Sequence, residues 1–237
     1  MPNKVAIIGA MDCEINKIKD VCNDIQIQEA NNLTIYTGTL YGHPAVIAKC
    51  GVGKVNAALN TQYIIDKFIP EIIINTGVAG GIGENLSIGD VVIGESLIQH
   101  DFNVTALGYT RGNICNRLIP DKPTVFHSDK KLVGLLENLL KNNSKSINFH
   151  TGRIATGDIF IGTTEMKKKI AAEFGAVAAE MEGCAIAQTA NLNNIPCLII
   201  RAISDLADGT ATKSQSEFEE MTSKISSEAV EILLKNL

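Results

Sequence analysis

Short runs of apolar and β-branched residues recur along the whole chain, and they predict the strands of a layered fold. Several are almost continuously hydrophobic, such as VAIIGA at 5–10 and EIIINTG at 71–77. A strand without polar alternation is covered on both faces, as in a sheet between two helical layers. The predicted strands lie at residues 5–10, 33–40, 44–50, 71–77, 90–98, 149–157, 175–181 and 196–204.

Amphipathic segments lie between these runs and predict helices. Residues 54–68 and 214–237 carry apolar side chains at three- and four-residue steps, 163–174 is a shorter charged segment, and 183–191 is rich in alanine. Strands that alternate with helices indicate an α/β domain with a largely parallel or mixed sheet. Residues 106–128 form the longest irregular stretch, and a loop of that length is often functional or part of an interface.

Composition excludes several classes of protein. The chain has 237 residues, 45% hydrophobic and 20% charged, with a net charge of -5, which is typical of a globular protein. Its length fits a single domain over residues 1–237. The acidic balance argues against a nucleic-acid partner, and no apolar run reaches the roughly 20 residues that span a bilayer. The N-terminus turns acidic too early for a signal peptide, so we expect a cytoplasmic protein.

Polar or glycine-rich residues follow four of the predicted strands. IIGAMDCE leads to Glu14, INTGVAGG is rich in glycine, AAEMEG carries Glu180 and Glu182, and RAISDLAD places Asp205 after Arg201. Ligands of open α/β sheets bind beyond the carboxyl ends of the strands, so these segments are the candidate site. Taken alone, the glycine-rich segment is more readily explained as a tight turn than as a ligand loop.

The candidate chemistry rests on carboxylates. The histidines do not assemble with a serine or cysteine nucleophile, and the six cysteines lack zinc-ligand spacing. Burying an unpaired carboxylate costs several kcal/mol, so Glu180 and Glu182 should each meet a donor. Two structural alternatives stay open: Glu182 as a helix-start acid, and Asp205 as a helix cap or a partner of Arg201.

Five ordered segments, IIGAMDCE, INTGVAGG, TGDIFI, AAEMEG and RAISDLAD, resemble signatures of bacterial 5'-methylthioadenosine/S-adenosylhomocysteine nucleosidases, within the purine nucleoside phosphorylase superfamily. The resemblance covers the whole chain. It implies a three-layer α/β/α sandwich around a mixed, partly barrel-like sheet, and a homodimer in which the partner's 100–125 region lies near the 5' pocket.

The resemblance also implies an activity. The substrates would be methylthioadenosine, adenosylhomocysteine and possibly 5'-deoxyadenosine, whose N-glycosidic bond is hydrolysed to release adenine and the sugar. No metal or cofactor would take part. The reaction would serve methionine salvage and the recycling of S-adenosylmethionine by-products.

The resemblance assigns roles to individual residues. Asp205 would protonate adenine at N7, and Glu14 would activate the water. Glu182 would bind the ribose 2' and 3' hydroxyls, and its charge would favour the cationic transition state. The remaining predicted residues are Phe160 stacking on adenine, Ile161 reading the purine edge through its backbone, Met181, Ala79 and Gly80 at the ribose, Ser204 and Arg201 supporting Asp205 and the water, and Glu180 behind them.

Several positions depart from the family pattern. Cys13 interrupts an acid-rich segment, Val78 stands where serine is common, and Leu107 and Gln215 stand where aromatic residues are common. The last three concern the ribose rim and the 5' pocket, so the preference among substrates stays open. Two alternatives remain: a purine nucleoside phosphorylase, and a catalytically silent nucleoside-binding protein. Glu14 would repel phosphate, which favours water as the attacking group.

Overall fold

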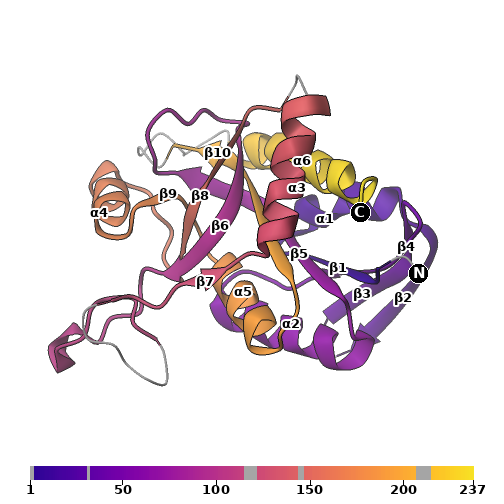
Figure 1. Ribbon diagram of the computed structural model, residues 1–237, viewed down its shortest axis with the longest axis horizontal. Coiled ribbons are helices and arrows are strands. Elements are labelled where there is room, and N and C mark those ends of the chain that lie inside the picture. Colours follow the sequence, from indigo (N-terminus) through magenta and orange to yellow (C-terminus); the bar gives the residue numbers. More distant parts are fainter. Residues whose placement is uncertain (1–2, 31–32, 115–121, 144–146, 207–214) are drawn as a thin grey trace.

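A computed structural model describes residues 3–30, 33–114, 122–143, 147–206 and 215–237, and it shows a mixed sheet between layers of helices (Figure 1). The strands are β1 (Val5–Gly9), β2 (Asn23–Ala30), β3 (Leu33–Leu40), β4 (His43–Lys49), β5 (Ile72–Gly81), β6 (Val91–Gln99), β7 (Phe126–His127), β8 (Phe149–Thr156), β9 (Ala176–Glu180) and β10 (Cys197–Asp205). The helices are α1 (Asp12–Asp20), α2 (Lys54–Phe68), α3 (Lys130–Asn143), α4 (Thr164–Phe174), α5 (Gly183–Leu192) and α6 (Gln215–Leu234), with a short 3-10 helix η1 (Thr105–Leu107).

Five of the strands close on themselves. Hydrogen bonds join them in the order β10, β6, β8, β9, β5, and β5 pairs back with β10. The sheet continues from β5 through β1, β4 and β3 to β2. It is mixed, because β10 runs parallel to β5 and antiparallel to β6. The predicted mixed, partly barrel-like sheet is therefore confirmed.

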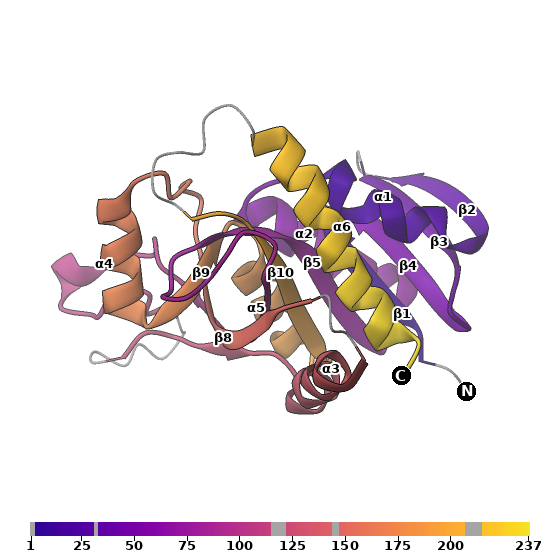
Figure 2. The same ribbon diagram turned by 90° about the horizontal axis from the view of Figure 1, so that it is seen from above.

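Helices cover both faces of this sheet (Figure 2). On one face, Ala57 of α2 and Ile186 of α5 share a buried cluster with sheet residues. On the other face, Ile15 of α1, Leu136 of α3 and Leu233 of α6 share a second cluster. Every residue of β1 is buried, which explains its unbroken hydrophobic run. Within the described ranges, no helix is long and apolar enough to cross a membrane.

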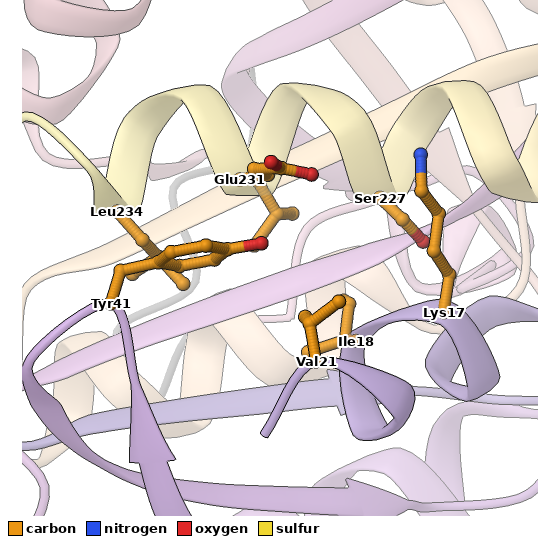
Figure 3. A pocket seen from close by; sticks show the side chains of 8 residues that line it. Lys17, Ile18, Val21, Tyr41, Ser227, Glu231 and Leu234 are labelled. Atoms are coloured by element: carbon orange, nitrogen blue, oxygen red, sulfur yellow. The ribbon is translucent and has the colours of Figure 1, made fainter. Parts of the chain in front are cut away.

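The long helix α6 packs along α1, the helix that carries Glu14. Figure 3 shows their contact near the end of α1, where Ile18 lies beneath α6. Tyr41, from the turn between β3 and β4, lies against Leu234 with its hydroxyl toward Glu231. Burial and then the Glu231 carboxylate raise the pKa of Tyr41 to about 12. Residues of α6 and Tyr41 thus line one small pocket together with the end of α1.

The structure corrects the interpretation of INTGVAGG as a turn. β5 continues as a strand through Gly81, pairing with β10 as far as Gly80 and with β9 at its end. Among the described elements, the sequence analysis missed η1 and β7, which are only three and two residues long. It also missed the edge strand β2, which is exposed along nearly its whole length, the short helix α1, and helix α3, although the buried leucines of α3 follow a helical spacing.

Candidate active site

The ends of β5, β9 and β10 meet the segment after β8 around one pocket. β5 pairs with both β9 and β10, so the three strand ends lie side by side. Six predicted site residues line the pocket together, accompanied by Ile159 and Ala179: Gly80, Phe160, Ile161, Glu180, Met181 and Asp205. The carboxyl ends of these strands thus form a candidate pocket, as is common in α/β sheets.

Asp205 reaches this pocket from the last residue of β10. The pairing of β10 with β5 shifts register between Ile203 and Asp205, so Ser204 lies in an irregularity of the strand. Such irregularities redirect side chains next to many active sites. The Ser204 hydroxyl donates to Asp205 Oδ2 at 3.0 Å and lies 3.4 Å from the Ala79 carbonyl oxygen. Ser204 therefore connects Asp205 to β5.

Arg201 is almost completely buried beneath the pocket. Its Nη2 donates to Glu180 Oε2 at 2.5 Å and to Asn75 Oδ1 at 2.6 Å. A buried ion of this kind is stable only when charge and hydrogen bonds compensate its lost hydration. Burial lowers the pKa of Arg201, but the neighbouring carboxylates of Glu180, Glu14 and Glu182 raise it by a larger amount. The guanidinium therefore stays charged.

Glu180 is fixed by hydrogen bonds on both carboxylate oxygens. Oε2 accepts from the N–H groups of Glu182 and Gly183, at 3.0 and 2.6 Å, while Oε1 accepts from the Thr156 hydroxyl. The first N–H groups of a helix lack partners within it, and here Glu180 satisfies two of them at the start of α5. Glu180, not Glu182, is the acid that stabilises this helix terminus.

Glu182 is the N-cap of α5, but its carboxylate does not bind the N–H groups of that helix. Its Oε1 accepts from the N–H of Gly53 at 2.8 Å, and its own helix offers it no capping hydrogen bond. Burial, followed by the neighbouring Glu180 carboxylate, raises the pKa of Glu182 to about 8. The charge predicted to favour a cationic ribose is therefore sensitive to pH near neutrality.

Glu14 lies on α1 and is buried against the middle of β5. Its Oε2 accepts from the N–H groups of Ala10 and Met11 at 2.6 and 3.0 Å, and its Oε1 from Val78 at 3.1 Å. The bond to Met11 also caps the start of α1. Burial raises the pKa of Glu14, and a raised proton affinity is what a general base near neutral pH needs.

A glycine makes room for Glu14 in β5. A Cβ atom on Gly77 would lie 2.5 Å from Glu14 Oε1 and 3.4 Å from Arg201 Nη1. A contact under 3.0 Å forces atoms to move, so any larger residue at this position would displace the Glu14 carboxylate. The glycine-rich strand therefore lets a carboxylate approach its backbone.

The structure also places the positions that depart from the family pattern. Leu107 is 72% exposed on η1, the Val78 N–H points to Glu14, and the side chain of Gln215 lies outside the described residues. Cys13 lines a groove between α1 and α6, apart from the pocket that contains Asp205.

Two buried polar residues of the site were missed by the sequence analysis. Asn75 donates to the Ile8 carbonyl and accepts from Arg201, and Thr156 donates to Glu180 and accepts from the Cys184 N–H. Asn75 follows a hydrophobic run inside β5, and Thr156 follows one at the end of β8. An isolated polar side chain in such a place needs a buried hydrogen-bond partner. That signal was present in EIIIN and RIAT.

Comparison with known proteins identifies the family. The family model described as the phosphorylase superfamily matches residues 4–237. A 5'-methylthioadenosine/S-adenosylhomocysteine nucleosidase of Staphylococcus haemolyticus (strain JCSC1435) is 41% identical over 98% of this chain and 100% of its own. This chain belongs to that nucleosidase family. The corresponding protein of Staphylococcus aureus (strain Newman) is 39% identical over the same shares.

Solved structures of the family share the fold. The nucleosidase of Neisseria meningitidis, in complex with methylthio-immucillin-A, has a TM-score of 0.92 and 37% identity, covering 99% of this chain and 100% of that one. The Streptococcus pneumoniae nucleosidase, with a transition-state inhibitor, has a TM-score of 0.90 and 36% identity over 98% of both chains. A futalosine hydrolase of Helicobacter pylori has a TM-score of 0.91 and 29% identity, covering 99% of this chain and 98% of that one.

Proposed function

We propose that this protein hydrolyses the N-glycosidic bond of 5'-methylthioadenosine and S-adenosylhomocysteine, releasing adenine and the corresponding thioribose. The observation that carries the proposal is the meeting of Asp205, Phe160 and Met181 in one pocket above a buried layer of carboxylates. Relatives named for this activity match the chain over nearly its whole length. In a cell the reaction would serve methionine salvage in the cytoplasm.

The chemistry needs one acid and one base. As the bond to adenine breaks, the ribose acquires oxocarbenium character, and Asp205 donates a proton to N7 of the departing base. Glu14 accepts a proton from water, whose oxygen bonds to the anomeric carbon. Glu182 holds the ribose hydroxyls, while Phe160 and the Ile161 backbone contact adenine.

Water is favoured over phosphate as the attacking group. A phosphorylase needs cationic donors to hold phosphate, whereas Glu14 would face the attacking group here. The nearby cation, Arg201, is already bonded to Glu180 and Asn75. The buried layer thus holds three carboxyl groups, those of Glu14, Glu180 and Glu182, around one guanidinium.

The proposal is tested by mixing the protein with methylthioadenosine in phosphate-free buffer and separating the products. We expect adenine and free methylthioribose. A strict phosphate requirement with a ribose-1-phosphate product would establish the phosphorylase alternative. Binding of the nucleoside without cleavage, with or without phosphate, would establish a silent binding protein. Relative kcat/KM for methylthioadenosine, adenosylhomocysteine and 5'-deoxyadenosine then defines the 5' preference.

We further propose that the protein acts as a homodimer, with the partner's 100–125 region near the 5' pocket. Val55 and Leu59 lie one turn apart on α2 and are 68% and 66% exposed, and Leu107 is also largely exposed. Exposed apolar side chains that gather on one face often mark an interface. An ion pair between Lys54 and Asp101 brings the start of α2 next to the segment before η1.

A further inference from the structure

Two carboxylates from different parts of the site meet the N-terminus of α2. The Gly53 N–H donates to Glu182 Oε1, and the Lys54 N–H donates to Asp158 Oδ1, each at 2.8 Å. These N–H groups have no partner within the helix and carry its partial positive charge, so they favour anions. Glu182 is the proposed ribose ligand, and Asp158 lies two residues before Phe160, the proposed adenine contact.

The side chain of Lys54 closes a ring of contacts with two aspartates. Its ammonium donates to Asp101 Oδ1 at 2.7 Å, and Asp101 Oδ2 accepts from the Asp158 N–H at 2.8 Å. Since the Lys54 N–H donates in turn to Asp158, these three residues form the Lys54–Asp101–Asp158 ring. The Lys54 ammonium also donates to Gln99 Oε1 at 3.1 Å.

The ring is shielded from solvent at its ion pair. The side chains of Lys54 and Asp101 are 16% and 12% exposed, far less than those of a typical surface pair. Burial raises the pKa of Asp101, but hydrogen bonds from Lys54 and from the Asp158 N–H outweigh it and hold this pKa below its usual value. Asp101 therefore stays ionised and bound to Lys54 at neutral pH.

Gly53 allows the close approach of these segments. Its φ of +98° lies in a region that other residues rarely adopt, and an added Cβ would lie 3.1 Å from Asp158 Oδ1. The backbone before α2 thus passes directly against the segment that leads to Phe160. The contacts span 104 residues between Lys54 and Asp158, and 129 between Gly53 and Glu182.

We propose that Lys54 is a positioning residue for the reaction. The Lys54–Asp101–Asp158 ring fixes the adenine-contacting segment relative to Glu182, because both are bound to the same helix terminus. A nucleoside held at its base and at its ribose then presents the glycosidic bond to Asp205 and Glu14 in one geometry. Small misplacements of reacting groups cost large factors in rate. This inference rests on the proposed nucleosidase function.

The test compares Lys54→Met, Asp101→Asn, the double variant and the conservative Lys54→Arg in the methylthioadenosine assay. We expect each of the first two to lower kcat/KM at least about tenfold, on the cost of misplacing reacting groups. The double variant should lose no more than about threefold beyond Lys54→Met, since both break the same ring. Lys54→Arg, which keeps a donor for Asp101, should recover activity to within about threefold of the wild type.

A matched control is Lys235→Met. This substitution breaks an ion pair of the same length, 2.7 Å from Lys235 Nζ to Glu231 Oε1 at the C-terminal end of α6, and neither residue lines the pocket that contains Asp205. We expect its kcat/KM to stay within about twofold of the wild type. Circular dichroism and thermal unfolding check that every variant is folded.

Inhibition by adenine separates positioning from general damage. Adenine occupies only the base side, so its inhibition constant in Lys54→Met should stay within about threefold while nucleoside kcat/KM falls. An inhibition constant that rises by the same factor, or Lys54→Met and Asp101→Asn activities within twofold of the wild type, would overturn the proposal. A wild-type protein that releases no adenine would reject the nucleosidase function, and the positioning role with it.

Discussion

Glu180 and Glu182 stand two residues apart, yet their carboxylates have different partners. Glu180 is held by Arg201, by the Thr156 hydroxyl and by two N–H groups of α5. Glu182 keeps one oxygen on the Gly53 N–H and has a strongly raised pKa. The more fully bonded acid suits a structural role, while the less bonded one fits its proposed role of accepting hydrogen bonds from the ribose hydroxyls.

Replacing Glu182 by Gln should change stability in a pH-dependent way. The unfolded carboxyl titrates near 4.5 and the folded one near 8. Between these values the folded wild type binds more protons than the unfolded chain, so its stability falls as pH rises. Because Gln does not titrate, we expect the Tm advantage of Glu182→Gln to grow from pH 5 to pH 8. A Tm difference that is independent of pH would contradict this.

Replacing Asp205 by Asn should remove the proposed general acid without disturbing the fold. The amide keeps the shape of the side chain but cannot protonate adenine. A well-placed acid typically contributes about 10²- to 10⁴-fold, so we expect turnover to fall at least about a hundredfold with an unchanged Tm. Adenine release measures this. As a control, Asp66→Asn on the exposed side of α2 should keep near-normal turnover, and near-normal turnover in Asp205→Asn would reject the assignment.

Among the elements, β5 links the strand ends to the buried carboxylates. It pairs with β1, β9 and β10, and its glycines let Glu14 lie against its backbone. The sequence located this segment but favoured a turn, because glycine marks turns far more often than the interiors of strands. The edge strand β2 was missed because both of its faces are exposed, so its sequence shows no alternation of buried and exposed residues.

Gly77→Ala tests the close approach of Glu14 to β5. The added Cβ would lie 2.5 Å from Glu14 Oε1, so Glu14 must move. We expect a loss of about 1–3 kcal/mol in the free energy of unfolding and about a hundredfold lower turnover. Chemical denaturation and the adenine assay measure the two effects. Wild-type turnover in a stably folded Gly77→Ala would show that the position of Glu14 is not critical.

Gly134→Ala is the matched control. Gly134 lies within α3, and an added Cβ would meet no atom within 4 Å. Alanine in a helix is favoured over glycine by about 0.5–1 kcal/mol. The substitution should therefore stabilise the protein slightly and leave turnover unchanged.

At the scale of the molecule, the closed barrel brings together residues that are distant in sequence. β10 occupies a place between β5 and β6, and this closure brings Asp205 beside Gly80. The chain then leaves apolar side chains of α2 and η1 exposed on its surface. Burial of these side chains against a second copy would account for them.

The homodimer proposal is tested by light scattering, which should give twice the chain mass of 25.4 kDa. A charge at the centre of an apolar interface is costly to desolvate, so Leu59→Glu should shift the population to monomers. Its activity should fall too, because the partner would complete the 5' pocket. Ile27→Glu, at an equally exposed apolar position on β2, should leave the mass unchanged. A monomeric wild type would reject the homodimer.

The sequence by itself determined most of the strands and most of the helices, since burial on one or two faces leaves a readable period in the chain. It also determined the candidate acids, because a carboxylate beside a hydrophobic strand needs a partner. The helix predicted at 54–68 begins and ends with α2, and the ends of the other predicted helices differ from the observed ones by at most three residues.

Only the tertiary structure decided which partner each acid has. Closure of the barrel depends on pairings between distant strands, and such pairings have no local signature. The bond from Gly53 to Glu182 spans 129 residues, and no pattern in the sequence linked these two residues. Hydrogen bonds and desolvation act over a few ångströms, so the partners of Glu180, Glu182 and Lys54 were decided only when folding brought these groups within that range.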